Sequence, residues 1–271
     1  MPEGDTITRT ARSLDAALAG RVLTRFEAPR LARMAPVLPG TVVTGVEAVG
    51  KHCLVHFDDG RTLRTHMRMT GSWHLYRPRE RWRRTHGAAR VVLEVAPADD
   101  REGWVAVCFS APVVELTARA DVAVAHLGPD LCRPDADLDE AARRLGRVDA
   151  AREIGVVLLD QTVSAGIGNV YKSETLFVCG LDPFTPAGEV PPALGRRLLV
   201  TASRLLRANL DSSRRSMSEK GGAASGLVAV YGRAGQGCRR CGTPVGRGVH
   251  REDARSSYWC PRCQVRPPAG G

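Results

Sequence analysis

The spacing of apolar positions changes along the chain, and each spacing predicts a different kind of element. Over residues 5–18 they recur every three or four positions, which predicts an amphipathic helix that stops at Gly20. From there to about residue 117 the chain consists of short β-rich runs separated by turn residues, a pattern typical of a β-sandwich. The predicted strands cover 42–49, 54–57, 62–66, 72–76, 91–95, 104–109 and 113–116.

A turn-rich segment from Leu127 to Asp137 then gives way to helical periodicity. The fold class is therefore α+β, with an N-terminal helix and β-sandwich followed by a helical region. The predicted helices cover 138–145, 154–161, 170–178 and 191–210. The predicted domains cover 1–130, 131–228 and 229–265, with a flexible tail at 266–271.

The charge balance indicates a polyanionic partner. The 271 residues carry 39 Lys and Arg against 29 Asp and Glu, a net charge of +10 spread along the whole chain. We expect nucleic acid rather than a membrane, because no apolar run of spanning length is present; a basic but otherwise ordinary enzyme is the alternative. Glu3, Asp5 and the lack of an apolar leader argue against a secretory signal, so a cytoplasmic protein is expected.

Four cysteines near the C-terminus have the spacing of a metal site. Cys238-x-x-Cys241 and Cys260-x-x-Cys263 are separated by eighteen residues, which predicts a closed four-thiolate shell around one structural Zn²⁺. So small a region has no core of its own, so the metal would supply most of its folding free energy. The cations between the two pairs are expected to face a phosphate backbone, unless the finger is only a structural cap; they are Arg247, His250, Arg251 and Arg255.

The first residues pair a potential nucleophile with a potential acid. Removal of Met1 would expose the secondary amine of Pro2, directly followed by the carboxylate of Glu3. An α-amino group has a reference pKa of about 7.7 to 8.0, against about 10.4 for lysine, so more of it is uncharged and nucleophilic at neutral pH. Its product with an aldehyde is a cationic iminium, which acts as an electron sink. Proline in second place also occurs for reasons unrelated to chemistry.

Three further features each allow two interpretations. Lys51 is one of only three lysines in a chain rich in arginine, and it follows Gly50 just before an apolar run. Either this place needs a compact ammonium group instead of a guanidinium, or a lysine occurs here by chance. The segment 66–71 places two methionines around an arginine, as a wedge for a base stack or as core residues. The glycine-rich break at 164–169 is either an anion site at a helix start or a plain interhelical turn.

Together these pieces resemble the formamidopyrimidine-DNA glycosylase and endonuclease VIII family. The resemblance rests on several motifs in the family's order: Met1-Pro2-Glu3-Gly4, Gly50-Lys51, His66 to Gly71, Leu127-Gly128-Pro129-Asp130, Asp160-Gln161 through Gly168-Asn169-Val170-Tyr171, Tyr231-Gly232-Arg233, and the two cysteine pairs. It implies an N-terminal helix with a β-sandwich, a helix-two-turns-helix domain and a β-hairpin zinc finger, with DNA between the halves, and a monomer.

The resemblance also implies catalytic roles. Pro2 would attack C1′ of the lesion nucleotide and form the Schiff base, while Glu3 would protonate the opening deoxyribose. Lys51 would bind phosphate and assist β-elimination, and Arg255 would grip phosphate and take part in δ-elimination. The base has to leave the stack before an amine reaches C1′, which costs least at a damaged pair.

DNA-contacting residues follow from the same resemblance. Asn169 would contact a backbone phosphate beside the flipped nucleotide, Arg68 would also contact DNA, and Met69 would fill the void left by the base. The chain departs from the family at two positions. Thr6 stands where many members have glutamate, and His126, a further expected DNA contact, replaces an arginine.

The resemblance predicts a bifunctional DNA glycosylase and AP lyase of base excision repair, acting on double-stranded DNA with damaged bases or abasic sites. The stretch from Arg214 to Arg233 is too short for a full cover over 8-oxoguanine, which favours oxidised pyrimidines, although Met69 is more typical of the purine branch. The alternatives are an 8-oxoguanine and formamidopyrimidine glycosylase of the same family, and a non-catalytic zinc-containing nucleic-acid binder.

Overall fold

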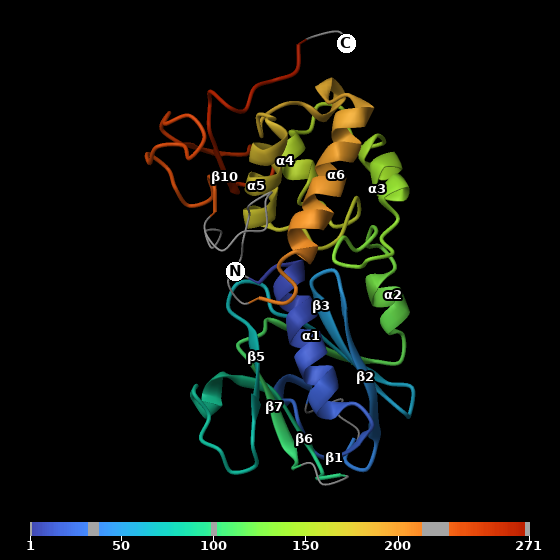
Figure 1. The fold of residues 1–271 in the computed structure, drawn as a ribbon. Coiled ribbons are helices and arrows are strands. Elements are labelled where there is room, and N and C mark those ends of the chain that lie inside the picture. Colours follow the sequence, from blue (N-terminus) through green and yellow to red (C-terminus); the bar gives the residue numbers. More distant parts are fainter. Residues whose placement is uncertain (1, 32–37, 99–101, 213–227, 269–271) are drawn as a thin grey trace. The chain divides into compact units, whose positions relative to one another are not determined.

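The chain forms two compact units, Met1–His126 and Leu127–Gly271, in a computed structural model that describes residues 2–31, 38–98, 102–212 and 228–268 (Figure 1). Each unit has its own apolar core. The predicted domain limits at residues 130, 228 and 265 are finer than this division and stay predictions.

Unit 1 is built on one continuous antiparallel sheet of eight strands in the order β5-β7-β6-β1-β2-β3-β4-β8. β1 pairs with β2 on one side and with β6 on the other, so it joins the two halves of the predicted sandwich. The strands are β1 (Arg21–Glu27), β2 (Val42–Val49), β3 (His52–Phe57), β4 (Thr62–His66), β5 (Ser72–Tyr76), β6 (Ala89–Val95), β7 (Trp104–Phe109) and β8 (Val113–Thr117). The short helices of unit 1 are η1 (Pro29–Leu31), η2 (His86–Ala88) and α2 (Ala120–Val124).

The first helix, α1 (Gly4–Leu18), is held by its apolar face. Its buried side chains join one cluster with residues from both halves of the sheet, and they include Ile7, Leu14 and Leu18. Full burial stabilises a side chain of this size by roughly 1.5 to 3 kcal/mol. α1 packs across β2 and β3 and also contacts β5 and β7, so the sheet fixes the helix and the residues that precede it.

Strand β1 is the element that the sequence pattern did not reveal. Its positions are mostly charged or exposed, and only Arg21 and Leu23 are buried. Arg21 tolerates burial because its guanidinium donates to the carbonyl oxygen of Glu102 at 2.7 Å. A buried arginine interrupts the apolar alternation from which strands are predicted.

Unit 2 combines helices with a C-terminal hairpin. The helices pack around one apolar cluster that contains Leu158, Tyr171 and Leu198. They are α3 (Leu138–Leu145), α4 (Ile154–Val157), α5 (Asn169–Cys179), η3 (Ala187–Glu189) and α6 (Pro192–Arg207); the hairpin strands are β9 (Gly246–Val249) and β10 (Ser256–Trp259). The hairpin is not separate from the helices, because β10 packs against α5.

Helix α4 is shorter than the predicted 154–161. Asp160 ends the helical path because its carboxylate accepts from both the backbone N–H (3.0 Å) and the hydroxyl (2.6 Å) of Thr162. The neighbouring Gln161 turns its side chain toward the next turn instead of continuing a helical face. Local side-chain bonds therefore outweigh the apolar spacing.

The predicted α+β fold is confirmed, with an N-terminal helix, a large sheet, a helical module and a hairpin beside four cysteines. Most of the segment used for the lesion argument, 213–227, lies outside the described residues, as do 269–271 of the predicted tail. Within the described ranges, every helix is too short or too polar to cross a bilayer.

Candidate functional site

Pro2 and Glu3 lie at the N-terminal end of α1. Glu3 is the N-cap residue, and its carbonyl oxygen accepts from the backbone N–H groups of Thr6 (2.9 Å) and Ile7 (3.0 Å). Its side chain is 1% exposed, whereas Pro2 is half-buried. The positive end of the helix dipole stabilises negative charge at this place. A carboxylate is thus held beside the amine that loss of Met1 would create.

Lys51 occupies the turn between β2 and β3, the two strands on which α1 packs most. Gly50 enters this turn with φ of +58°, a left-handed conformation that glycine adopts without a steric penalty. His52 and His66 pair across β3 and β4 just beyond it, with ring centroids 4.8 Å apart in an edge-to-face arrangement. The lysine therefore stands beside two packed imidazoles.

Both imidazoles are kept neutral by their surroundings. Burial, followed by the charges of Lys51 and Arg68, lowers the pKa of His66 to about 4. Burial, followed by the neighbouring His66, lowers the pKa of His52 to about 3. Arg64 donates to Nδ1 of His52 at 3.0 Å, which requires that nitrogen to be unprotonated. The positive charge around these two rings therefore comes from Lys51, Arg64 and Arg68 and not from the imidazoles themselves.

The segment 67–71 turns Met69 outward. Its side chain is 75% exposed, whereas Met67 is 2% exposed in the core. Gly71 makes the turn possible, because a Cβ there would lie 2.7 Å from the carbonyl oxygen of Met67. Arg68 has φ of +45°, and its backbone N–H donates to Nδ1 of His66 at 3.1 Å. Only one of the two methionines is thus a core residue.

His126 is exposed at the last position of unit 1. After burial and the neighbouring His66, Arg64 and His126 contribute to the lowered pKa of His52. Lys51 and Arg68 contribute in the same way to the lowered pKa of His66. These three predicted site residues therefore act electrostatically on one pair of imidazoles.

In unit 2, Gln161 shapes the glycine-rich turn before α5. Its amide donates to the carbonyls of Leu159 (2.8 Å) and Ile167 (3.1 Å), and its Oε1 accepts from the backbone N–H of Gly166 (3.1 Å). Gly166 has φ of +105°, outside the range that other residues adopt readily. This turn sets Asn169 at the first position of α5.

Asn169 joins α5 to the hairpin. Its Nδ2 donates to the carbonyl oxygen of Ser256 at 2.9 Å, and Nζ of the fully buried Lys172 donates to the same oxygen at 3.2 Å. Two donors from one helix therefore fix the backbone next to Arg255. The sequence did not indicate Lys172 as a site residue, since a lysine within a helix is usually exposed, whereas almost every residue of α5 is buried.

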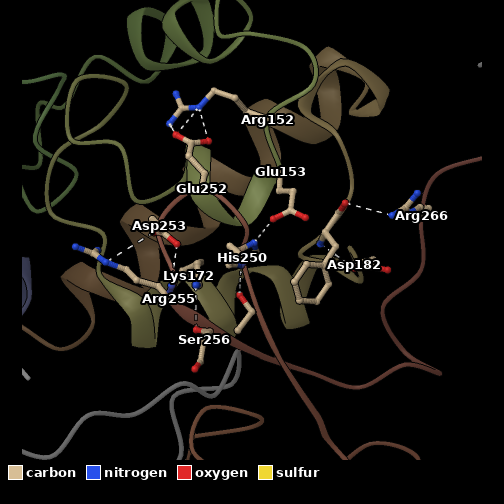
Figure 2. A network of polar contacts seen from close by, with 12 residues as sticks. Arg152, Glu153, Lys172, Asp182, His250, Glu252, Asp253, Arg255, Ser256 and Arg266 are labelled. Carbon is tan, nitrogen blue, oxygen red and sulfur yellow. Dashed lines mark hydrogen bonds and ion pairs between the residues drawn. The ribbon is translucent and has the colours of Figure 1, made fainter.

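Two charge-assisted contacts hold the loop between β9 and β10 from the other side (Figure 2). Arg152 binds the carboxylate of Glu252 with both Nε (3.0 Å) and Nη2 (2.7 Å). Glu153 accepts from Nδ1 of His250 at 2.6 Å. These partners are about a hundred positions apart in the chain, so no local pattern could indicate them.

The loop presents Arg255 to solvent. Its guanidinium is exposed and lies 3.8 Å from Asp253, whose carboxylate also accepts from the backbone N–H of Arg255 at 2.9 Å. The expectation that His250 faces phosphate is wrong. His250 is 1% exposed, its Nε2 contacts the hydroxyl of Ser257 at 2.6 Å, and burial lowers its pKa, so it is a packing residue.

Four sulfur atoms lie together at the base of the hairpin. All Sγ atoms of Cys238, Cys241, Cys260 and Cys263 are within 4.8 Å of one another. The separations Cys238 to Cys263 (4.0 Å) and Cys241 to Cys260 (3.5 Å) are far longer than a disulfide. They bracket the spacing of about 3.8 Å that tetrahedral ligands 2.3 Å from a zinc ion require. The cluster can therefore hold one metal ion.

A buried carboxylate positions the segment that leads into this cluster. Glu174 on α5 is fully buried and accepts from three consecutive backbone N–H groups, those of Ala229 (2.7 Å), Val230 (2.9 Å) and Tyr231 (2.9 Å). Burial raises its pKa despite these donors. The helix that begins at Asn169 thus holds both the hairpin and its entry segment.

Comparison with known proteins decides the family. A model of the formamidopyrimidine-DNA glycosylase N-terminal domain matches residues 1–105, and a model of the H2TH domain matches 127–220. The "Probable endonuclease 8 2" of Streptomyces coelicolor is 44% identical, over 98% of this chain and 95% of its own. The chain belongs to the formamidopyrimidine-DNA glycosylase and endonuclease VIII family. This confirms the resemblance and, at the level of the family, the prediction of a DNA glycosylase and AP lyase.

Other relatives and solved structures agree. The "DNA-(apurinic or apyrimidinic site) lyase Nei2" of Mycolicibacterium smegmatis is 40% identical over 98% of this chain and 99% of its own. A "Formamidopyrimidine-DNA glycosylase" of Methylococcus capsulatus is 32% identical over 97% of this chain and all of its own. The Lactococcus lactis enzyme, solved with DNA containing an AP site, has a TM-score of 0.79 at 21% identity, covering 98% of this chain and 100% of that chain. That likeness shows the fold.

Apart from Met69 and the four cysteines, the predicted site residues fall into three groups. Pro2 and Glu3 lie at the start of α1, and Lys51, Arg68 and His126 act electrostatically on the paired imidazoles. Asn169 and Arg255 adjoin Ser256 in unit 2. Met69 projects from its turn in unit 1. The first two groups and the third belong to different units.

The neutral imidazoles predict a stability that depends on pH. Because the folded pKa values of His52 and His66 lie below the ordinary value near 6.5, the unfolded chain binds more protons below that pH. The free energy of unfolding should be highest above pH 6.5 and should fall as the pH is lowered toward about 4. Urea unfolding of the wild type and of His66→Asn checks this; equal slopes of stability against pH in the two proteins would contradict it.

Proposed function

We propose that the chain is a bifunctional DNA glycosylase and AP lyase of base excision repair that acts on double-stranded DNA with damaged bases or abasic sites. The observation that carries the proposal is the placement of Pro2 and Glu3 at the start of α1, in a chain that is 44% identical to a relative named as a probable endonuclease 8. A monomeric cytoplasmic enzyme without a membrane partner completes the proposal.

In the proposed reaction, the nitrogen of Pro2 attacks C1′ of the damaged nucleotide. The C1′–N bond breaks and its electron pair leaves with the base, which takes up a proton. Glu3 then protonates the ring oxygen of deoxyribose, the ring opens, and the proline and C1′ form an iminium. Loss of a C2′ proton expels the 3′ phosphate, because the iminium accepts the electron pair. Pro2 is half-buried, so its amine stays accessible to the nucleotide. Glu3 is buried, so its carboxyl group is held in one position, which favours proton transfer to a single atom, the ring oxygen.

Lys51 and Arg255 are the proposed phosphate-binding catalytic cations. Lys51 stands beside imidazoles that stay neutral. The positive charge that attracts a phosphate at this place is therefore that of the ammonium and not of the two rings. Arg255 is exposed on a loop whose backbone is fixed from both sides. A fixed arginine offers a planar set of donors that matches phosphate oxygens.

The remaining proposed DNA contacts are Arg68, Met69, His126 and Asn169. Met69 is the exposed apolar side chain of unit 1 best suited to enter a base stack, at 75% exposure. Arg68 and His126 are exposed beside the same imidazoles. Asn169 uses one amide N–H for Ser256 and keeps the other, together with the start of α5, for a phosphate.

The proposed metal is one structural Zn²⁺ on the four cysteines, whose sulfur separations suit a tetrahedral thiolate shell. Bound zinc would hold the base of the hairpin and would take no part in the reaction.

Oxidised pyrimidines are the proposed base substrates. The stretch from Arg214 to Arg233 is short for a cover over a flipped purine. Relatives named endonuclease 8 are 34% to 44% identical to this chain, against 32% for the relative named formamidopyrimidine-DNA glycosylase. The exposed Met69 favours the alternative, a purine-directed enzyme of the same family.

A covalent adduct tests the enzyme proposal. Protein from which Met1 has been removed, as verified by mass spectrometry, should be trapped on an abasic-site duplex by borohydride. A form that retains Met1, or carries an N-terminal tag, should still bind DNA without forming the adduct. Glu3→Gln should bind normally and lower the rate of adduct formation by roughly 10² to 10⁴-fold, the usual contribution of a general acid, because ring opening precedes the iminium. Absence of any adduct would leave the non-catalytic nucleic-acid binder.

The lesion preference is tested with matched duplexes. Base release from thymine glycol or dihydrouracil should exceed release from 8-oxoguanine in the same sequence context, measured as single-turnover rates. Faster release of 8-oxoguanine would reverse the preference and leave the lyase proposal intact, because an abasic site requires no base recognition.

Metal removal tests the zinc proposal. Elemental analysis should find one zinc per chain, and Cys260→Ser should lose it. Because the cysteines are themselves part of the small apolar cluster that packs this region, chelation should unfold the hairpin and weaken DNA binding while the α1 and sheet unit stays folded. Circular dichroism and limited proteolysis check this. A metal-free protein with an intact hairpin and unchanged affinity would contradict it.

A further inference from the structure

The connection between β5 and η2 carries a dense group of arginines that the proposed reaction does not use. Residues 77–86, called here the arginine loop, contain five arginines and one glutamate, a formal charge of 5 − 1 = +4. β5 is an edge strand of the sheet, so the loop lies at the border of unit 1 (Figure 1). The arginines of the loop are exposed; they are Arg77, Arg79, Arg81, Arg83 and Arg84.

Aromatic packing fixes this loop in place. Trp82 lies against Tyr76 (ring centroids 6.3 Å apart) and Phe109 (5.9 Å), in a small apolar cluster between β5, β6 and β7. His86 stacks on the same indole at 4.2 Å. The backbone N–H of Arg83 donates to the hydroxyl oxygen of Tyr76 at 3.2 Å. The cations are therefore carried by an anchored scaffold, which lowers the entropy cost of using them together.

Only the first arginine of the loop has an acidic partner among the described residues. Arg77 lies over the ring of Trp104 at 3.8 Å and pairs with Glu102 at 3.3 Å. Glu80 accepts from the backbone N–H of Arg77 at 2.8 Å. For Arg79, Arg81, Arg83 and Arg84 no carboxylate of the described residues lies within ion-pair distance.

These side chains surround a hollow instead of spreading over a flat face. A cavity of about 600 Å³ is lined by the arginine loop together with Arg25, Glu94 and Val105. Arg25 is already paired with Glu27 and Glu94, so the loop supplies the unbalanced charge. Several guanidinium groups held around one hollow repel each other, and an anion with several charges relieves that repulsion.

We propose that the arginine loop is a second DNA-binding site, which holds the phosphate backbone of a duplex apart from the damaged nucleotide. The loop begins where β5 ends, whereas the turn that carries Met69 lies before β5 starts. Five strand residues at about 3.3 Å each separate the two by roughly 15 Å, the length of four to five base pairs. Guanidinium forks match phosphate oxygens, and the lining has few apolar side chains with which to anchor a protein partner.

The test measures binding of undamaged DNA, so it does not depend on catalysis. Arg81→Gln/Arg83→Gln/Arg84→Gln should bind an undamaged duplex of about 30 base pairs roughly tenfold more weakly near 0.1 M salt, and its slope of log Kd against log salt should fall by about 2 to 3. Arg81→Lys/Arg83→Lys/Arg84→Lys, the matched control, keeps the charge and should keep most of the slope. Fluorescence anisotropy at several salt concentrations gives both quantities.

Two further measurements complete the test. Thermal unfolding shows whether the neutral variant is folded; if it is not, Arg83→Gln/Arg84→Gln, which keeps Arg81 beside Trp82, replaces it. Borohydride trapping of saturating abasic duplex should be unchanged. An unchanged affinity and slope would overturn the proposal, as would trapping that falls in parallel with binding, because the arginines would then belong to the lesion site. The proposal would also be overturned if the neutral variant bound DNA normally but no longer bound an acidic polypeptide such as polyglutamate. The arginine loop would then be a protein-binding site.

Discussion

The junction of α5 and the hairpin in unit 2 depends on one backbone oxygen, the carbonyl of Ser256. It accepts from Asn169 and from Lys172, and the ammonium of Lys172 is fully buried. An ammonium without water needs fixed acceptors, so the helix and the hairpin stabilise one another only in this register. The same helix holds the entry to the cysteine cluster through Glu174. Helix α5 is thus the frame to which the exposed Arg255 is fixed.

In unit 1, packing of a helix on the sheet fixes the position of the candidate site residues, whereas in unit 2 buried polar contacts do so. The sheet of unit 1 is continuous through β1, and α1 lies on both of its halves, so apolar packing fixes the helix, together with the backbone N–H of Val46, which donates to Asp15 at 2.7 Å. The start of α1 is occupied by a buried carboxylate, Glu3, in the positive field of the helix end. A terminal proline would otherwise be among the most mobile residues of a chain. The proposed role of Pro2 as a positioned nucleophile requires rigidity at this place.

The cations of the chain differ in how they are held, although the sequence gives them the same appearance. The guanidinium of Arg152 forms ion pairs with Glu252 and Asp160, and that of Arg21 is buried and donates to a carbonyl oxygen. Arg255 and the arginine loop are instead exposed on anchored backbone. Net charge therefore indicates a polyanionic partner but does not say which arginines meet it. The contrast between guanidinium groups held by short bonds to an acceptor and guanidinium groups that stay exposed to solvent makes that distinction.

Local sequence patterns were enough to predict most of the elements and the cysteine cluster. Apolar spacing is a local property, so it predicted α1, α3 and most strands, and two Cys-x-x-Cys pairs indicated four thiols that lie together and can hold one metal ion. It missed β1, where a buried arginine breaks the alternation, and it assigned His250 to the surface. The tertiary structure decided which polar residues meet across a hundred positions, as with Glu153 and His250 or Asn169 and Ser256. Those contacts follow from burial and hydrogen-bond satisfaction in the folded state, which no short window of sequence contains.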